Sequence, residues 1–363
     1  MNFYTVQFFA RNKFLFFTWI LISLYLVQIT MVYLQSNANG KNKLQFPTIR
    51  PNDLASSRVP QRNSMAEPML KYNLMEEIYG EKYKNSKTHY SSVECNEDYA
   101  NKNKLQQDHP CVIHLIQTSY LRKPTPLNLS YNLSKPEFTN PSDGQSQAIL
   151  RLLRNQTGGF FIESGALDGE FLSNTLFMER FLNWTGILIE ADRKAFRQLS
   201  ARNRKAYTSP ACLSTKPYPI QVIFNASGWS GSFIVSEENM STKQNLPNMN
   251  SNIKERANNE VIYAVQCFPL YSILLAIGQT TVDFFGLDVE GSEYKILKTI
   301  PWHKVDIKTL SVEWNHIPEG ELAMTQFMER NKYVKFGNIE MPYSREIVYI
   351  QDFLDDFRQY EFD

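Results

Sequence analysis

The sequence has almost no excess of charge and lacks several motifs that mark metal or nucleotide sites. Its 38 Lys and Arg residues balance 37 Asp and Glu residues, which leaves a net charge of +1. This balance argues against nucleic acid or an anionic surface as the main partner. Only four cysteines are present and none forms a C-x-x-C pair, so a zinc cluster is disfavoured. No G-x-G-x-x-G spacing occurs, which argues against a dinucleotide site.

One long stretch without charge lies near the start of the chain, at residues 14–34. A helix of that length spans about 31 Å, enough for the core of a bilayer. A cleavable signal peptide is the alternative, because Ser36 and Ala38 could mark a cleavage site. The run is longer than the apolar region of most signal peptides, so we expect an uncleaved transmembrane signal anchor. Residues 1–13 are then a short cytoplasmic tail.

Two further features suit an oxidising compartment on the far side of that membrane. Six acceptor triplets for N-glycosylation occur, all in predicted loops or turns, at Asn128, Asn132, Asn155, Asn183, Asn225 and Asn239. The even number of cysteines suits disulfides, with Cys95–Cys111 and Cys212–Cys267 favoured among the three possible pairings. Free buried thiols in a cytosolic protein are the alternative. We therefore expect a type II membrane protein whose bulk is lumenal or extracellular.

The chain after the predicted anchor divides by composition. Residues 35–142 are polar and rich in Asn, Lys, Ser and Pro, and we expect a stem followed by a segment that wraps around the domain. Residues 143–351 alternate between helical and strand patterns. This alternation predicts a doubly wound, mostly parallel seven-stranded α/β sheet with helices on both faces and an antiparallel edge strand. Residues 236–259 read as a surface insertion within this domain, and residues 352–363 form an acidic tail.

The stretch 157–192 has the pattern of strand, glycine turn, helix and strand. A short apolar run ends at Glu163, Gly165 and Gly169 bracket a turn, and a second predicted strand ends at Glu190. Glycine tolerates positive φ and lets backbone N–H groups approach a ligand. An acidic residue at the second strand end is suited to accept hydrogen bonds from ribose hydroxyls. The spacing favours a nucleoside site over a turn with no ligand.

A second group of acidic residues follows later predicted strands. Asp288, Glu290 and Glu293 surround Gly291 after one buried strand, and they need a cation, a proton or an amine-bearing ligand nearby. In a parallel sheet, the carboxyl ends of the strands meet at one edge. One crevice should therefore be lined by Glu163, Asp168, Glu190, Asp288, Glu290, Glu313 and His316.

Several motifs in the domain resemble the FkbM-type methyltransferase family. They are F-I-E-S-G-A-L-D-G-E, G-I-L-I-E-A-D, A-C-L-S, G-L-D-V-E-G-S-E-Y-K-I-L-K and S-V-E-W-N-H. More specifically, S-N-T-L-F-M-E-R-F-L-N-W-T-G-I-L-I-E-A-D and I-P-W-H-K-V-D-I-K-T-L-S-V-E-W-N-H look like the Star-like proteins of insects and other arthropods. The resemblance covers roughly residues 143–351, together with the arrangement of anchor and stem.

The resemblance to methyltransferases implies a fold that binds S-adenosylmethionine. The cofactor-binding set that it implies has Glu163 and Gly165 at the methionine part, Glu190 at the ribose, Ala211 and Cys212 at the adenine, and Asp168 and Gly169 in the glycine turn. The third-strand loop lacks the acidic residue with which many methyltransferases hold adenine, so adenine would depend on backbone groups.

The same resemblance places the catalytic groups on the later strands. Asp288 and Glu290 would lie beside the transferred methyl group, and His316 would be the candidate base that takes a proton from a hydroxyl. A histidine that caps a loop by hydrogen bonds is an equal alternative for His316. A metal bound by Asp288, Glu290 and Glu313 is an alternative that we rank below a hydrogen-bond network without a metal.

The resemblance to Star-like proteins implies another role. Members of that family are type II membrane proteins that help membrane-bound growth-factor precursors leave the endoplasmic reticulum. The expectation from it is a trafficking factor of the endoplasmic reticulum and Golgi membrane, or of the endosome or plasma membrane, with such precursors as protein cargo. The alternative is an active O-methyltransferase acting on a secretory-pathway glycan or small molecule. A lumenal domain has limited access to S-adenosylmethionine, which is made in the cytosol, and this favours the trafficking role.

Overall fold

The computed structural model describes residues 95–226, 232–237, 254–255 and 261–353. The predicted tail and anchor, most of the predicted stem, Asn239 and the acidic tail from residue 354 onward lie outside these ranges. Within the described residues, no helix has the length and apolar character needed to cross a membrane. Of the predicted insertion, the ends at residues 236–237 and 254–255 are described.

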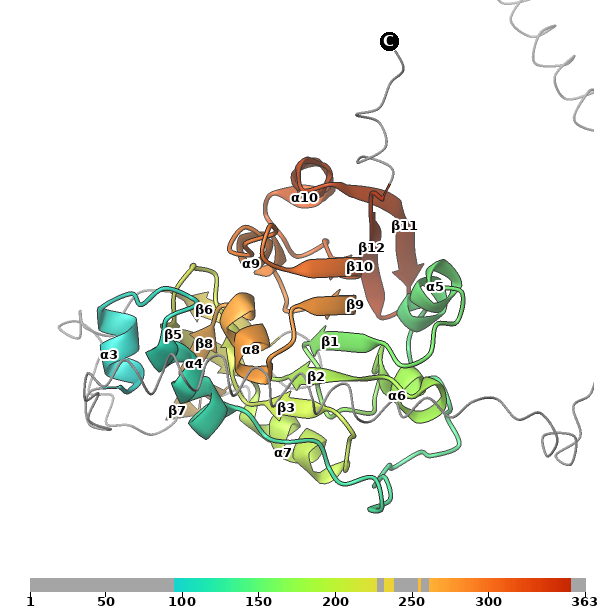
Figure 1. Ribbon diagram of the computed structural model, residues 1–363, viewed down its shortest axis with the longest axis horizontal. Helices are drawn as coiled ribbons and strands as arrows, with labels where there is room; N and C mark the ends of the chain where they lie inside the picture. The colour runs from blue at the N-terminus through green and yellow to red at the C-terminus, as the bar shows by residue number, and fades with distance from the viewer. Residues whose placement is uncertain (1–94, 227–231, 238–253, 256–260, 354–363) are drawn as a thin grey trace, which may run out of the picture. The chain divides into compact units, whose positions relative to one another are not determined.

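Seven strands form the central sheet (Figure 1), in the order β11-β12-β10-β9-β1-β2-β3. The strands are β1 (Phe160–Ser164), β2 (Thr185–Ile189), β3 (Tyr207–Ser209), β9 (Thr281–Leu287), β10 (Asp306–Glu313), β11 (Tyr333–Met341) and β12 (Ser344–Gln351). Strands β1, β2, β3, β9 and β10 are parallel to their neighbours among these five. The strand order reverses between β1 and β9, so a crevice is expected beyond their carboxyl ends.

The expected position of the antiparallel strand was wrong. Strand β12 is antiparallel to both of its neighbours, β10 and β11, and lies between them, so the edge of the sheet is β11. The tight turn between Met341 and Ser344 returns the chain directly alongside β11. Because the helix between β10 and β11 carries the chain one place past β10, a gap remains that β12 fills. The hydrophobic pattern of two paired strands does not reveal which of them is outermost.

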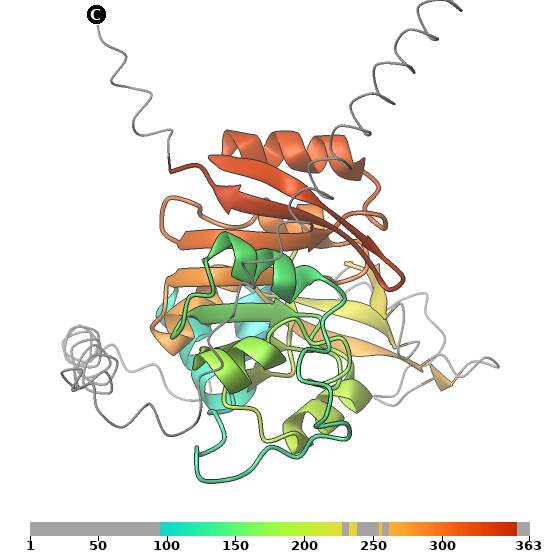
Figure 2. The same ribbon diagram turned by 90° about the vertical axis from the view of Figure 1, so that its right-hand side faces the viewer.

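Helices cover both faces of this sheet, as expected for a doubly wound fold. One face packs against α4 (Pro110–Leu115), α8 (Leu270–Ile277), α9 (Glu293–Leu297) and α10 (Gly320–Arg330). The other face packs against α5 (Gln145–Leu152), α6 (Leu176–Leu182) and α7 (Arg193–Ala201). Figure 2 shows α5 and α6, in green, in front of the strands. In β1, Phe160 and Ile162 face the first set of helices and Phe161 the second, because successive side chains of a strand alternate between its faces.

A second, smaller sheet was not foreseen. It has the order β4-β8-β5-β6, and β7 pairs with β8. Its strands are β4 (Cys212–Leu213), β5 (Ile220–Ala226), β6 (Phe233–Ser236), β7 (Lys254–Glu255) and β8 (Val261–Phe268). In Figure 1 it lies to the left of the seven strands. Cys212 and Cys267 are register partners in β4 and β8 and are joined by a disulfide, so this bond fixes one end of the small sheet.

The segment before the central sheet is more ordered than a stem. Residues Glu97–Lys102 form α3, and a disulfide joins Cys95 to Cys111 at the start of α4. These are the two cysteine pairs favoured from the sequence. Helix α4 and the single π-turn Ile116–Tyr120 contribute Val112, Leu115 and Ile116 to the core against α8. Residues before the predicted domain start at residue 143 therefore contribute to the core of the domain.

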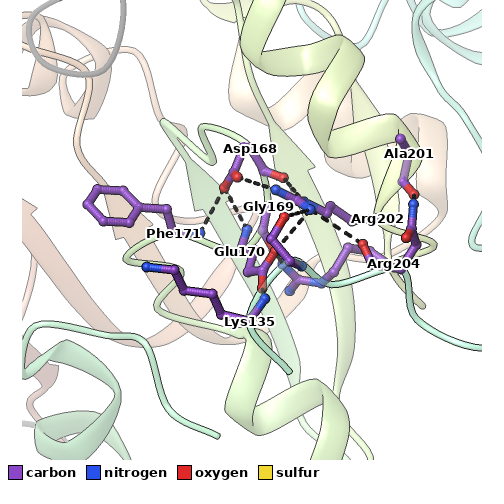
Figure 3. A network of polar contacts seen from close by, with 10 residues as sticks. Lys135, Asp168, Gly169, Glu170, Phe171, Ala201, Arg202 and Arg204 are labelled. Atoms are coloured by element: carbon purple, nitrogen blue, oxygen red, sulfur yellow. Dashed lines mark hydrogen bonds and ion pairs between the residues drawn. The ribbon is translucent and has the colours of Figure 1, made fainter. Parts of the chain in front are cut away.

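Residues 121–143 wrap around the surface and are held by a network of polar contacts (Figure 3). The Glu170 carboxylate accepts hydrogen bonds from the backbone N–H groups of Ser134 and Lys135, at 2.7 and 2.6 Å. Arg202, after α7, pairs with Asp168 and, at 3.0 Å, with Glu170. The wrapping segment, the turn after β1 and the end of α7 are thus held together by two carboxylates and one guanidinium.

Candidate functional site

A cavity of about 370 Å³ opens at the carboxyl ends of β1, β2 and β9, where the strand order of the large sheet reverses. A volume of this size accommodates a small ligand. The small sheet closes another side through β4, β5 and β6. The predicted residues that line the cavity are Glu163, Gly165, Glu190, Ala211, Cys212, Asp288 and Glu290. The structure therefore brings seven of the ten predicted cofactor-binding and catalytic residues to one cavity.

Glu163, at the end of β1, lines the cavity, but its carboxylate is hydrogen-bonded to other groups of the protein. It is 4% exposed, and its carboxylate accepts hydrogen bonds from Asn174 N–H at 2.8 Å, from Ser173 Oγ at 3.0 Å and from Thr175 Oγ1. Burial raises the pKa of Glu163, against the lowering effects of nearby Arg204 and of these hydrogen bonds. Its carboxylate holds the loop that leads into α6, which is a structural role in addition to the expected contact with a ligand.

Glu190, just after β2, keeps part of its hydrogen-bonding capacity. Oε2 accepts from Leu167 N–H and Oε1 from Asp192 N–H, both at 2.7 Å. The backbone N–H of Ala191 also stabilises this carboxylate, so of its about four acceptor positions about one remains for a ligand in the cavity. Burial raises the pKa of Glu190 to about 7, partly offset by the backbone N–H groups that stabilise the charged form. The side chain is fixed by the backbone and is presented to the cavity, as a ribose-binding carboxylate must be.

Gly165 is required by the protein backbone itself. Its φ is +84°, and a Cβ atom there would lie 1.9 Å from the carbonyl oxygen of Asp288. The N–H groups of Gly165 and Ala166 both donate to the carbonyl oxygen of Ile189, at 3.0 and 3.1 Å. The expectation that this glycine frees backbone N–H groups for a ligand was therefore wrong. Its role is to let the ends of β1 and β9 approach each other beside the cavity.

Asp168 and Gly169 do not line the cavity, and this corrects their predicted cofactor-binding role. One Asp168 oxygen accepts from the backbone N–H groups of Glu170 and Phe171, at 2.9 and 2.8 Å, and the other pairs with Arg202 (Figure 3). A Cβ atom on Gly169 would lie 2.4 Å from a methyl group of Leu199. Both residues shape the turn and dock it on α7, a role that the spacing of the glycines does not distinguish from ligand binding.

The predicted adenine region is a largely apolar wall built by the small sheet. Ala211, Cys212 and Leu213 lie beside the cavity together with Phe224 of β5 and Ile234 of β6. The disulfide from Cys212 to Cys267 braces this wall. Among the lining side chains from this sheet and its loops, none is acidic, which agrees with an adenine held by backbone groups and apolar contacts.

The acidic residues on the other side of the cavity form a close cluster. His316 Nδ1 lies 2.7 Å from Glu290 Oε2 and 3.0 Å from Glu313 Oε1. His316 itself is not among the cavity-lining residues, and its side chain is 49% exposed. Its position as a direct base for a substrate in the cavity is therefore not supported. Asp288 and Glu290 are the two members of the predicted catalytic set that face the cavity.

The pKa values in this cluster are raised by burial and by mutual repulsion. Burial and then the charge of Glu290 raise the pKa of Asp288 to about 6. Burial and the charges of Asp288, Glu293 and Glu290 raise the pKa of Glu313 to about 11. Burial also raises the pKa of Glu293 to about 7, although its oxygens accept from the N–H groups of Val289 and Gly291. The cluster carries more carboxyl groups than it can hold in the charged state without a proton or a cation.

Some residues of the cavity were missed by sequence reasoning. Phe171 and Tyr343 line it, with exposed fractions of 39% and 71% and ring centroids 6.3 Å apart. Tyr343 lies in the turn between β11 and β12, and Ser344 and Gln145 also reach the cavity from distant parts of the sequence. No local pattern marks these residues, because their position depends on where the final hairpin lies in the sheet.

The predicted glycosylation sites differ in accessibility. Asn128, Asn132, Asn155 and Asn183 are exposed and lie outside strands, as expected. Asn225 lies within β5 and is 6% exposed, so its placement in a loop was wrong. The alternation of β5 directs this side chain inward, and in the folded domain it is not accessible for modification.

Comparison with protein families supports the methyltransferase character of the domain. Residues 163–335 match the family model described as Methyltransferase FkbM domain. The match begins at the end of β1 and ends in β11, so it includes the glycine turn and the acidic ends of β2, β9 and β10. The chain thus contains a methyltransferase-like domain, and residues 163–335 of it are similar to the FkbM type.

Solved structures that are similar to this chain are methyltransferases, at low identity. Methyltransferase FkbM from Methylobacillus flagellatus KT is 14% identical, with a TM-score of 0.33, over 53% of this chain and 43% of that one. Precorrin-6y C5,15-methyltransferase from Geobacter metallireducens GS-15 is 11% identical, with a TM-score of 0.27, over 63% and 95%. Human methyltransferase 10 domain containing protein is 10% identical, with a TM-score of 0.29, over 67% and 95%. Among curated proteins, no match is found.

Proposed function

We propose that the domain binds S-adenosylmethionine in the cavity at the β1–β9 switch point and transfers its methyl group to a hydroxyl group. The observation that carries this proposal is the position of Glu190. It follows β2, it is 7% exposed, and it lines the cavity with part of its acceptor capacity unused by the protein. This is the arrangement that a ribose diol requires.

The remaining lining residues fit the other parts of such a ligand. Phe224, Ile234 and the disulfide-braced Ala211–Leu213 segment offer a flat apolar surface to an adenine ring. Asp288 and Glu290 supply negative charge on the opposite side, which suits a cationic sulfonium and an amino group. Their arrangement supports one nucleoside-containing ligand that extends between the two walls.

When bound, S-adenosylmethionine would supply a methyl cation equivalent to an acceptor oxygen, with the S–C bond breaking, the O–C bond forming and a neutral thioether remaining. The residues of the chain then have separate tasks. Glu190 orients the ligand, and the Asp288 carboxylate accepts the proton that the acceptor hydroxyl loses. Phe171 and Tyr343 form an aromatic pair at the cavity that suits the face of a sugar or another flat acceptor.

Isothermal titration calorimetry of the full-length chain with S-adenosylmethionine tests the proposal. We expect measurable heat in the wild type and a loss of at least about 100-fold in affinity for Glu190→Ala, because a buried group that accepts hydrogen bonds is removed. Glu340→Ala, at an exposed position on β11, is the matched control and should bind like the wild type. Far-UV circular dichroism verifies that Glu190→Ala is folded.

Two outcomes would reject binding at this site. Wild-type protein that releases no heat at millimolar ligand has no such site. Binding that survives in both Glu190→Ala and Glu190→Gln takes place elsewhere. The conservative Glu190→Gln variant keeps the shape of the side chain, so it remains informative if the alanine variant fails to fold.

We propose in addition that the chain is a type II membrane protein of the secretory pathway, with this domain lumenal or extracellular. Two disulfides and four exposed acceptor asparagines support the proposal, because disulfides persist in oxidising compartments. Endoglycosidase treatment of the full-length protein from a secretory cell should increase its electrophoretic mobility. Unchanged mobility, together with free thiols, would reject it.

In that setting, the Star-like motifs support a second candidate function, the escort of membrane-bound growth-factor precursors from the endoplasmic reticulum. The escort role predicts that Asp288→Lys combined with Glu290→Lys leaves export of the cargo intact in a folded protein. Loss of export would instead favour a role that depends on the cavity.

A further inference from the structure

Three side chains from two loops converge at one point beside the cavity. Glu290 follows β9, and Glu313 and His316 are at and just after the end of β10. His316 Nδ1 is 2.7 Å from an oxygen of Glu290 and 3.0 Å from an oxygen of Glu313. One ligand atom from each of the three residues lies within 4.8 Å of the other two. Ligands on neighbouring positions of a six-coordinate cation lie about 3 Å apart when each is about 2.1 Å from the metal.

A second observation indicates that this cluster lacks a positively charged or hydrogen-bonding partner for the Glu313 carboxyl group. Glu313 is 7% exposed, its Oε2 receives no hydrogen bond from an N–H or hydroxyl group of any described residue, and its carboxyl group is instead paired with the carboxyl group of Asp288, which requires a proton or a cation. A buried acceptor without a donor costs free energy unless a partner binds it. Glu313 also offers a ligand atom to a second set, with Asp288 and Glu293. The unsatisfied oxygen therefore belongs to the residue that both sets share.

The backbone holds these residues in place. Glu290 has a φ of 61°, a left-handed conformation that is uncommon for a residue other than glycine. Gly291 has a φ of +105°, and a Cβ atom there would lie 3.0 Å from the carbonyl oxygen of His316. The two loops thus approach each other through a glycine, and this close contact brings Glu290 next to His316.

We propose that Glu290, Glu313 and His316 bind a divalent transition-metal cation, with Mn²⁺ as the best match. Two carboxylates favour a hard cation and an imidazole favours a transition metal, and Mn²⁺ accepts both. Metal binding requires an unprotonated ring nitrogen on His316, and its Nδ1 is the nitrogen that lies beside both carboxylates. Because Glu290 also lines the cavity, a cation held by these residues would lie beside the cavity.

The position of this site suggests a use, which rests on the proposed methyl transfer. A hydroxyl group of the acceptor that is bound to the cation loses its proton more easily, since a metal ion lowers the pKa of a coordinated oxygen. Asp288, which faces the same cavity, accepts that proton. Metal binding itself does not depend on methyl transfer, and it is tested without S-adenosylmethionine.

Electron paramagnetic resonance of Mn²⁺ titrated into the metal-free full-length chain measures the free cation directly. We expect one Mn²⁺ per chain at micromolar to submillimolar affinity, weakened at least about 10-fold in Glu290→Gln and in His316→Asn. Glu340→Gln makes the same chemical change at an exposed site and should leave the affinity unchanged. Ca²⁺, which prefers oxygen ligands, should compete weakly.

Thermal unfolding with and without Mn²⁺ adds a signature that a purely structural cluster would not give. Mn²⁺ should raise the melting temperature of the wild type and of Glu340→Gln, but not that of Glu313→Gln. Without metal, Glu313→Gln should melt at about the wild-type temperature, because the raised pKa of Glu313 keeps its carboxyl group neutral and the amide that replaces it is neutral as well.

Several results would overturn the proposal. The site is not a metal site if Mn²⁺ at 1 mM is not bound, or if the Glu290 and His316 variants bind as tightly as Glu340→Gln. Competition by Ca²⁺ at equal strength would mean that His316 is not a ligand. The proposed S-adenosylmethionine site would survive any of these results, since its calorimetric test depends on Glu190 and contains no metal.

Discussion

The carboxylates on the two walls of the cavity have different surroundings. On the wall formed by the ends of β1 and β2, the buried carboxylates Glu163 and Glu190 are held by hydrogen bonds from the protein. Glu179 of α6, which is not part of the cavity lining, is likewise held by Arg204. On the wall formed by the ends of β9 and β10, Asp288 and Glu313 lie beside further carboxylates and raise each other's pKa. The carboxylates of the first wall are anchored by the protein, whereas those of the second wall repel one another.

This difference indicates which carboxylates serve the fold and which are available for chemistry. A carboxylate whose acceptors are filled by backbone N–H groups fixes a loop, and its removal should destabilise the protein. A carboxylate that is crowded by like charges is in an unfavourable electrostatic environment. Its neutralisation should therefore not destabilise the protein. Four variants test this contrast, in order of decreasing expected effect.

The largest effect is expected at the buried pair of Arg204 and Glu179, whose side chains are fully inaccessible and whose atoms are 3.0 Å apart. Arg204 also donates to Gly169 O and Thr175 Oγ1. Arg204→Met should lower the free energy of unfolding by about 3–5 kcal/mol, because it leaves a buried charge without its partner. Urea denaturation measures this, with Arg197→Met, on exposed α7 surface, as the control. A loss below about 1 kcal/mol would show that this wall does not depend on its ion pair.

The next effect is the pH dependence that Glu190 imposes. Its pKa is about 7 in the folded protein, against an ordinary value of 4.5, so between these values the folded state binds more protons than the unfolded state. The stability contributed by Glu190 is therefore full below about pH 4.5 and decreases as pH rises to about 7, by about 3 kcal/mol. Asp192, whose charge also raises this pKa, is the neighbouring carboxylate.

Glu190→Gln should remove this slope. The difference in unfolding free energy between variant and wild type, measured by urea denaturation at pH 5 and pH 8, should shift in favour of the variant at the higher pH. A difference that stays constant with pH would contradict a raised pKa at Glu190. The other raised carboxyl groups are present in both proteins, so they cancel in this comparison.

A smaller effect is expected at Glu163. Glu163→Gln replaces one acceptor oxygen by an NH₂ group, which cannot accept from Asn174 N–H or from the hydroxyls of Ser173 and Thr175. The cost should be about 1–3 kcal/mol, since a buried donor is left without a partner. Thermal unfolding detects this, and amide hydrogen exchange should increase first at residues 173–176. Unchanged exchange there would mean that Glu163 does not hold the loop.

The smallest effect is expected on the other wall. Asp288→Asn should change the free energy of unfolding by less than about 1 kcal/mol, and any change should be stabilising, because it removes a charge beside Glu290 and Glu313. Chemical denaturation at pH 7.5 measures it, with Glu163→Gln as the contrasting variant. If Asp288→Asn destabilises the protein as much as Glu163→Gln does, the two walls are not different in kind.

Part of the fold was predictable because it depends on local patterns. Short apolar runs that end in Glu163 and Glu190 gave the positions of β1 and β2, and the alternation of strands with helical patterns gave a sheet with helices on both faces. The grouping of Glu163, Glu190, Asp288 and Glu290 also followed, because parallel strands present their carboxyl ends at one edge. These inferences need only the period of side chains along each element.

The pairing and contacts between distant segments depend on the tertiary structure. The second sheet depends on pairing β4 and β5 with β8, 35 to 55 residues away, and the position of β12 between β10 and β11 depends on a crossover. Asp168 and Gly165 look like ligand residues in the sequence, but Arg202 binds the former and the carbonyl of Asp288 requires the latter. The sequence alone determined which carboxylates follow the ends of the strands, because strand ends are local; of the predicted lining residues, Asp168, Glu313 and His316 do not line the cavity. Only the folded chain decided which of them are already satisfied, because their hydrogen-bond partners come from other elements.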